Sequence, residues 1–137
     1  MRSLQTQRFM KNLLIVLLGM LFTSCRESVE YTKMVENNSD EIVYVLVKDQ
    51  GNENDSVWVS LPVDKQFEVY TDFVEGSWED FQNCDYDNKR VWIYNNAGTV
   101  HFEITNSPNW IREEDYKDGR KTNHLQCIYK VQTGVME

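Results

Sequence analysis

The stretch that most constrains the fold is residues 42–47, in which every side chain is Val, Ile, Leu or Tyr. Successive side chains of a strand point to opposite faces of its sheet, so a strand built from this run is apolar on both faces. Such a strand is typical of the centre of a sheet that is covered on both sides. The run therefore favours two packed layers over a single open sheet.

Short β-prone runs that alternate with turn clusters make up most of the remaining chain. The Asn and Asp residues of segment 37–40 favour a turn, because these side chains bond to their own backbone and tolerate positive φ. Segment 95–98, Asn-Asn-Ala-Gly, suits a four-residue hairpin loop. The pattern predicts a single small antiparallel β-sandwich of about seven strands. The predicted strands are residues 29–35, 42–47, 56–60, 66–71, 91–94, 99–104 and 125–131.

Two segments depart from this alternation. Residues 72–90 are polar and rich in aromatic side chains, and a loop of this length in a small domain is often functional or mobile. Near residues 108–116 we expect a short helix, with Ser107 as its cap and Pro108 in its first turn. The acidic residues that follow suit the N-terminal end of a helix dipole.

The N-terminus has the layout of a secretory signal peptide. Basic residues, among them Arg2 and Arg8, precede an apolar run at residues 13–22 and the small residues before Cys25. The run is much shorter than the roughly 20 residues of a membrane-spanning helix. We expect a signal peptide at 1–24, a lipidated tether at 25–30 and the β-sandwich domain at 31–137.

The sequence Phe22-Thr23-Ser24-Cys25 resembles a lipobox of the Bacteroidetes type. Together with the turn at 36–40, the later hairpin, the Asn109-Trp110 segment and the final strand, it makes the chain similar to small uncharacterised lipoproteins of the Bacteroidetes. The resemblance implies lipid on Cys25, which anchors the chain to a membrane. It brings no known activity, so it adds no catalytic residue.

The residues after Cys25 bear on which membrane holds the protein. In the lipoproteins that the chain resembles, Asp at the next position favours the inner membrane, whereas this chain has Arg26. The resemblance therefore implies the outer membrane. Acidic residues soon after the cysteine are linked to surface display, and Glu27 and Glu30 match that pattern only in part. The periplasmic face and the cell surface both stay open.

The charge balance excludes one class of partner. The full chain has a net charge of −8, and removal of the three basic residues before Cys25 changes it to −11. An acidic domain repels phosphate backbones, so we expect no nucleic-acid partner. Calcium, a cationic partner and plain solubility are all compatible with this charge, and solubility is the favoured interpretation.

Lipid on Cys25 leaves Cys84 and Cys127 as the two remaining cysteines. The cell envelope permits disulfides, but spacing alone does not show that the two residues meet. A disulfide and a pair of free thiols, one buried and one in a loop, therefore both stay open. No zinc-like spacing of Cys and His occurs, and we expect no cofactor.

Neither histidine carries a catalytic motif, and we expect both His101 and His124 to face solvent. Oxygen-bearing side chains in the 72–90 loop could hold Ca²⁺, but a solvated acidic loop is favoured because the EF-hand spacing is absent. Glu79 and Asp80 could serve glycoside hydrolysis only as a chance pair. We predict no catalytic residue and no metal site. The loop residues considered as calcium ligands are Asp80, Asn83, Asp85, Asp87 and Asn88.

The four tryptophans are the clearest functional signal. Trp58 and Trp92 are expected opposite the core faces of their strands, as part of a second hydrophobic layer. Trp78 and Trp110 fall in irregular segments, where exposed rings would mark a binding surface for sugar rings or for a protein.

The function that we expect from these features is a non-enzymatic binding or accessory module of the cell envelope. Three alternatives remain. The first is a small glycan-directed hydrolase, and the second is an inhibitor or immunity-type protein whose acidic face binds a basic partner. The third is a structural envelope component with no ligand.

Overall fold

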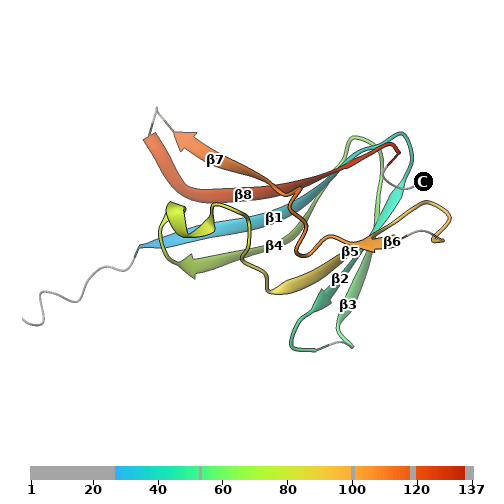
Figure 1. The fold of residues 1–137 in the computed structure, drawn as a ribbon, viewed down its shortest axis with the longest axis horizontal. Helices are drawn as coiled ribbons and strands as arrows, with labels where there is room; N and C mark the ends of the chain where they lie inside the picture. Colours follow the sequence, from blue (N-terminus) through green and yellow to red (C-terminus); the bar gives the residue numbers. More distant parts are fainter. Residues whose placement is uncertain (1–26, 53, 100, 118–119, 135–137) are drawn as a thin grey trace, which may run out of the picture.

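The structure, a computed structural model, describes residues 27–52, 54–99, 101–117 and 120–134. This part of the chain forms eight strands and one short 3-10 helix, arranged as two packed four-stranded sheets (Figure 1). The predicted all-β sandwich is confirmed. The elements are β1 (Ser28–Asn38), β2 (Val43–Asp49), β3 (Ser56–Leu61), β4 (Gln66–Glu75), η1 (Trp78–Phe81), β5 (Lys89–Tyr94), β6 (His101–Glu103), β7 (Ile111–Lys117) and β8 (Arg120–Gln132).

The two sheets have the strand orders β4-β1-β8-β7 and β3-β2-β5-β6. The second sheet is antiparallel throughout its described pairs. In the first sheet, β1 and β8 are the central strands and pair in parallel, with Tyr31 opposite Leu125. The first and last strands of the domain therefore lie side by side, which adds one parallel pair to the antiparallel arrangement that the sequence predicts.

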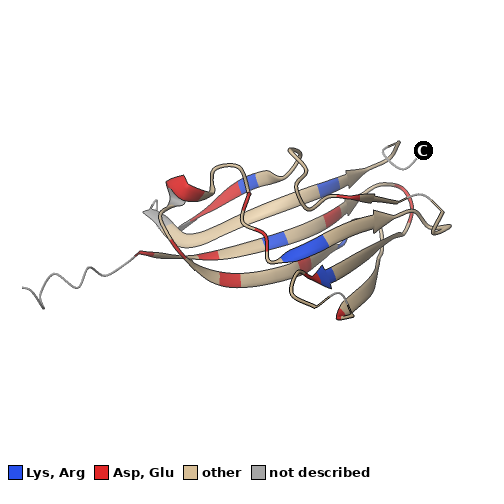
Figure 2. Cartoon of the chain, turned by 60° about the horizontal axis from the view of Figure 1, so that its bottom comes forward, with Lys and Arg blue, Asp and Glu red and all other residues tan. Residues whose placement is uncertain are grey.

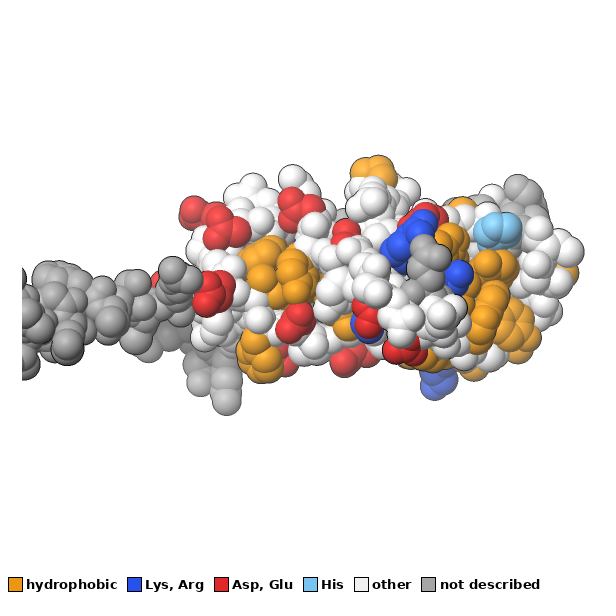
Figure 3. All heavy atoms as spheres, turned by 90° about the horizontal axis from the view of Figure 1, so that it is seen from below, with side chains coloured by type: hydrophobic (Ala, Val, Ile, Leu, Met, Phe, Trp, Pro, Cys, Tyr) orange, Lys and Arg blue, Asp and Glu red, His pale blue; other side chains and the backbone are white. Residues whose placement is uncertain are grey.

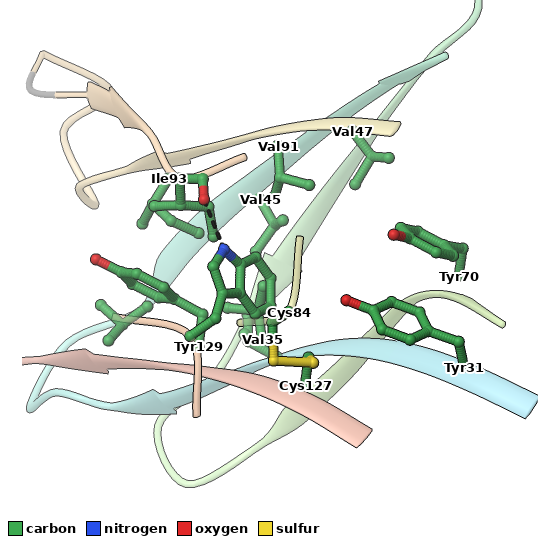
Figure 4. Close-up of a cluster of buried hydrophobic side chains, with 14 of the residues drawn as sticks. Tyr31, Val35, Val45, Val47, Tyr70, Cys84, Val91, Ile93, Cys127 and Tyr129 are labelled. Atoms are coloured by element: carbon green, nitrogen blue, oxygen red, sulfur yellow. Dashed lines mark hydrogen bonds between the residues drawn. A yellow bond between two sulfur atoms is a disulfide. The ribbon is translucent and has the colours of Figure 1, made fainter. Parts of the chain in front are cut away.

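The core lies between the sheets and follows the alternation in the sequence. Val43, Val45 and Val47 of β2 are all buried. Val45 and Val47 face residues of β1 and β8 from the other sheet, among them Val35 and Tyr129 (Figure 4). The predicted inward residues of β8 are all buried. They are Leu125, Cys127, Tyr129 and Val131.

The predicted helix near 108–116 is wrong, because residues 111–117 form strand β7, which pairs with β8. Pro108 and Asn109 form a turn before it. The backbone N–H of Asn109 donates to the Ser107 hydroxyl at 3.2 Å, so the side chain expected to cap a helix stabilises a local turn. Pairing along β8 supplies strand hydrogen bonds that outweigh the helix signal.

The hairpin prediction at 95–98 agrees with the structure. Gly98 donates its amide to the Asn95 carbonyl at 2.9 Å and adopts a φ of 68°, a conformation that glycine takes without steric cost. The loop joins β5 to β6, so it places His101 beside Tyr94.

Strand β1 begins at Ser28, one residue before the predicted strand at 29–35, and Val29 is buried. The predicted signal peptide and the lipid-bearing Cys25 lie outside the described residues. The described residues contain no helix with the length and hydrophobicity that a membrane span requires.

Candidate functional site

Strand alternation presents a set of aromatic side chains on the outer face of the β3-β2-β5-β6 sheet. In β5, Val91 and Ile93 are buried in the core. Because side chains alternate along a strand, Trp92 and Tyr94 face outward. The prediction that Trp58 and Trp92 stand opposite the core faces is consistent with this arrangement. The outer face also carries Tyr44, Leu46, Lys48 and Arg90 at matching register positions.

Leu46 lies between the two outward-facing tryptophans of this sheet. Its register partners are Trp58 on β3 and Trp92 on β5, one on either side. Although Leu46 belongs to the outer face, only 5% of its surface is exposed. A leucine at the centre of this face is thus shielded by its neighbours, and the surrounding rings gain apolar contact that holds them in place.

Three rings form a continuous line across this sheet, which we call the aromatic row: Trp58, Tyr94 and His101. The ring centres of Trp58 and Tyr94 are 4.7 Å apart, although β2 separates their strands, so the rings must reach across β2. Tyr94 stacks on His101 at 4.8 Å with the planes 16° apart. Trp58 is 56% exposed and His101 is also exposed. Figure 3 shows hydrophobic side chains gathered beside a histidine and near basic side chains.

A hollow of about 280 Å³ lies beside the aromatic row, and we call it the cationic hollow. The Arg90 guanidinium carbon lies 4.7 Å from the centre of the Trp92 ring, and the Lys48 ammonium lies 5.4 Å from it. Such cation–π contacts fix the two basic groups against the tryptophan. The residues lining the hollow are Lys48, Asp49, Gln50, Arg90 and Trp92.

Two carboxylates partly neutralise this region. Arg90 donates two hydrogen bonds of 2.9 Å to Glu103, and this pairing lowers the pKa of Glu103. Lys89 donates to Asp49 at 3.1 Å and lowers the pKa of that carboxyl. Lys48 has no carboxylate partner among the described residues, so its charge is the one that remains available in the hollow.

The expectation that Trp110 is an exposed binding residue is wrong. Trp110 is 7% exposed, and its indole NH donates to the Ile104 carbonyl at 2.7 Å. The Lys33 ammonium lies 4.5 Å from the ring centre. The ring therefore belongs to the core, although its edge helps to line a depression with Tyr129. Trp78 is the first residue of η1, and its side chain lies outside the described part of the structure.

The loop expected to be functional or mobile instead covers the core. The loop is shorter than the predicted 72–90, since β4 continues to Glu75 and β5 begins at Lys89. A disulfide joins Cys84 to Cys127 with 5.8 Å between their Cα atoms, which supplies the pairing that spacing alone left open. Phe81 is buried against the same core. The loop is thereby fixed to β8.

A buried ion pair fastens the same loop to β1. The Lys33 ammonium contacts the Asp87 carboxylate, and only 1% of the lysine side chain is exposed. Burial lowers the pKa of Lys33, while the bond to Asp87 acts in the opposite direction. Because its partner is fixed inside the core and the pair is shielded from solvent, this lysine serves the fold rather than a ligand.

The acidic side chains of the loop do not converge. Asp87 pairs with Lys33, whereas Asp80 accepts a hydrogen bond from the Ser77 amide at 2.7 Å and lies exposed beside the exposed Glu79. Among the described residues, no group of three or more His, Cys, Asp and Glu side chains is placed to hold a metal ion.

A contact network around His124 is one that sequence reasoning missed. Its Nε2 lies 3.2 Å from the Thr32 hydroxyl, which lies 2.8 Å from the Thr71 hydroxyl, and its Nδ1 lies 3.8 Å from Asp115. Thr32 is only 3% exposed, so a substrate carbonyl could not reach its oxygen. Only the β1–β8 register brings Thr32 close to His124, and no local pattern signals that pairing.

No family model, curated protein or solved structure matches this chain. The aromatic row and the cationic hollow are therefore the features of the molecule that bear on its function.

Proposed function

We propose that this chain is a non-enzymatic carbohydrate-binding module of the cell envelope, and that the aromatic row is its contact surface. The observation that carries the proposal is the line of three contacting rings, with Trp58 more than half exposed at one end. Large aromatic groups that are left open on a sheet face usually have a partner. The apolar C–H face of a sugar ring can pack on such a ring, as other apolar groups do.

The surroundings of the row favour a glycan over a protein. A stable protein interface buries roughly 800 Å² on each partner around an apolar centre. Here the apolar strip is narrow, because Ser56 and Ser60 flank Trp58 along β3 and the Arg90–Glu103 pair lies on the same face. Hydroxyl and charged groups beside a narrow line of rings suit a ligand with an apolar ring face and many hydroxyl groups.

The proposed lipid anchor at Cys25 fits this surface. The start of β1 and strand β6, which carries His101, lie at opposite ends of the molecule (Figure 1). Lipid on Cys25 would hold the β1 end near an outer membrane and leave the aromatic row directed away from it. The proposal places the row where a polysaccharide outside the lipid surface could reach it.

The described geometry gives no support to the glycan-directed hydrolase. The candidate pair Glu79 and Asp80 is exposed, and Asp80 is engaged by the start of η1. The carboxylates with a resolved perturbation, Glu36, Asp49 and Glu103, have lowered pKa values, which is opposite to the shift that a general acid needs.

The test is binding of the full-length chain, in detergent solution, to an array of oligosaccharides, followed by calorimetry on those that bind. We expect Trp58→Ala to weaken binding roughly tenfold, which corresponds to about 1.4 kcal/mol. Phe73→Ala is the matched control, because Phe73 is 73% exposed but lies on β4 of the other sheet. Binding to no oligosaccharide, or equal affinities for the two variants, would contradict the proposal.

A further inference from the structure

The cationic hollow is unusual on this molecule because it gathers basic groups in an acidic chain. The chain has 22 acidic and 14 basic residues. Acidic segments are spread over its strands and loops, whereas Lys and Arg segments are fewer (Figure 2). Three of the basic residues, Lys48, Lys89 and Arg90, nevertheless lie on the adjacent strands β2 and β5.

Two of these cations directly oppose each other. Lys48 and Arg90 are register partners across β2 and β5, and both contact the Trp92 ring. Like charges placed opposite each other on one sheet face are destabilising. The Arg90 charge is compensated by Glu103, whereas Lys48 has no such compensation among the described residues. A bound anion in the hollow would relieve this repulsion.

The hollow lies next to the aromatic row along β5. Trp92 and Tyr94 lie two residues apart on the same face of β5, a separation of roughly 7 Å along a strand. A single oligosaccharide could therefore place one ring against the row and an adjacent unit in the hollow. Gln50, which also lines the hollow, adds an amide group that can bond to hydroxyls.

We infer that the proposed glycan ligand is acidic, and that the Lys48 ammonium binds its anionic substituent while the aromatic row contacts the neighbouring sugar ring. This inference rests on the proposed function. The substituent is a carboxylate or a sulfate ester, since an ammonium group pairs with either anion. Because the chain as a whole is negatively charged, it can bind an acidic glycan only where positive charge is concentrated locally. The hollow is such a place.

The experiment compares matched acidic and neutral probes on the full-length chain. Oligogalacturonate is titrated beside its methyl ester, which removes the charge and retains the sugar. Dextran sulfate oligosaccharides are titrated beside dextran oligosaccharides of the same length. Preference within the first pair identifies a carboxylate, and preference within the second identifies a sulfate.

We expect the acidic member of one pair to bind at least about tenfold more tightly than its neutral partner. This preference should disappear when the salt concentration is raised from about 20 mM to about 500 mM, because salt screens the contact between the two charges. Lys48→Gln should weaken binding of the acidic probe about fivefold to tenfold and should change binding of its neutral partner much less. Lys65→Gln is the control, since Lys65 is exposed in the turn between β3 and β4.

The outcomes separate the two proposals. Equal binding of acidic and neutral probes, with Trp58→Ala still defective, would overturn the acidic preference and leave carbohydrate binding intact. Equal losses for Lys48→Gln and Lys65→Gln would overturn the role of Lys48. Failure of all probes together with a silent oligosaccharide array would remove carbohydrate binding itself.

Discussion

The ion pair between Lys33 and Asp87 gives the sharpest test of how the core is built. Lys33 is almost fully buried, and Trp110 covers its ammonium. Asp87→Asn would leave this ammonium without its carboxylate inside the core. Removing one partner of a buried pair typically destabilises a protein by about 3–5 kcal/mol, because the remaining charge is desolvated without compensation. A buried lysine can also lose its proton, which limits the cost.

The matched substitutions follow from the same geometry. Asp85→Asn is the control, because Asp85 is an exposed carboxyl in the same loop and should change stability by no more than about 0.5 kcal/mol. Lys33→Met with Asp87→Asn replaces the pair by an apolar side chain and a neutral amide. This double variant should be more stable than Asp87→Asn alone, since no buried charge is then left unpaired.

The assay is urea unfolding at pH 7, with the disulfide intact, monitored by tryptophan fluorescence. With a slope of about 1–3 kcal/mol/M, a loss of about 4 kcal/mol moves the midpoint by roughly 2 M. Equal midpoints for Asp87→Asn and Asp85→Asn would refute the buried pair.

The pH dependence of Asp87→Asn follows from the same lysine. Burial lowers the pKa of Lys33 in the folded state below its unfolded value. Between these two pKa values the unfolded chain binds more protons, so stability should rise with pH through this window. Asp87→Asn removes the hydrogen bond that opposes the lowering of the Lys33 pKa. The stability that this variant loses relative to the unsubstituted protein should therefore become smaller between about pH 7 and about pH 9.5, a range that lies below the pKa of an unfolded lysine.

Two further measurements test the core and the loop. Replacing both Cys84 and Cys127 by Ala removes a cross-link between residues that are 43 positions apart. Urea unfolding should then show a loss of stability of about 4 kcal/mol, the value that the entropy of closing a loop of this length gives. An unchanged unfolding midpoint would contradict the cross-link. Burial raises the pKa values of Tyr31 and Tyr70 above 10.0, so the unfolded chain ionises first and stability should fall as pH rises above 10, by about 2–3 kcal/mol at pH 11. Tyr70→Phe should reduce this slope by roughly a quarter to a half, because the pKa values of Tyr31, Tyr86 and Tyr129 are raised as well. An unchanged slope would place the titration elsewhere.

The fold class was predictable because it depends on alternation along the chain. Residues 42–47 required cover on both faces, and β2 indeed lies inside its sheet, with Val45 in the core and Leu46 under the outer rings. The hairpin at 95–98 was predictable for a similar reason, since its Asn and Gly residues act within a few positions of the chain.

The errors arose where distant pairing decides the structure. The Ser107-Pro108 signal is compatible with a helix start, but the backbone of 111–117 pairs with β8 instead. The position of Trp110 depends on Ile104 and on Lys33 from β1, which no local pattern places beside it. The sequence predicts only part of the candidate site, namely that Trp58 and Trp92 face away from the core. The row itself exists because β2 lies between β3 and β5, and that order comes from packing.

The proposed anchor and the proposed site together explain why weak individual contacts would suffice. The rings of the aromatic row already pack on one another, and Leu46 supports the face from below, so binding needs little further ordering of side chains. A row this narrow contacts only a short piece of a glycan. Lipid on Cys25 would hold many copies on one membrane, and a long polysaccharide that touches several rows gains from their high effective concentration. An open, preformed row of rings on a sheet face suits repeated contact with an extended polymer better than enclosure of a single small molecule.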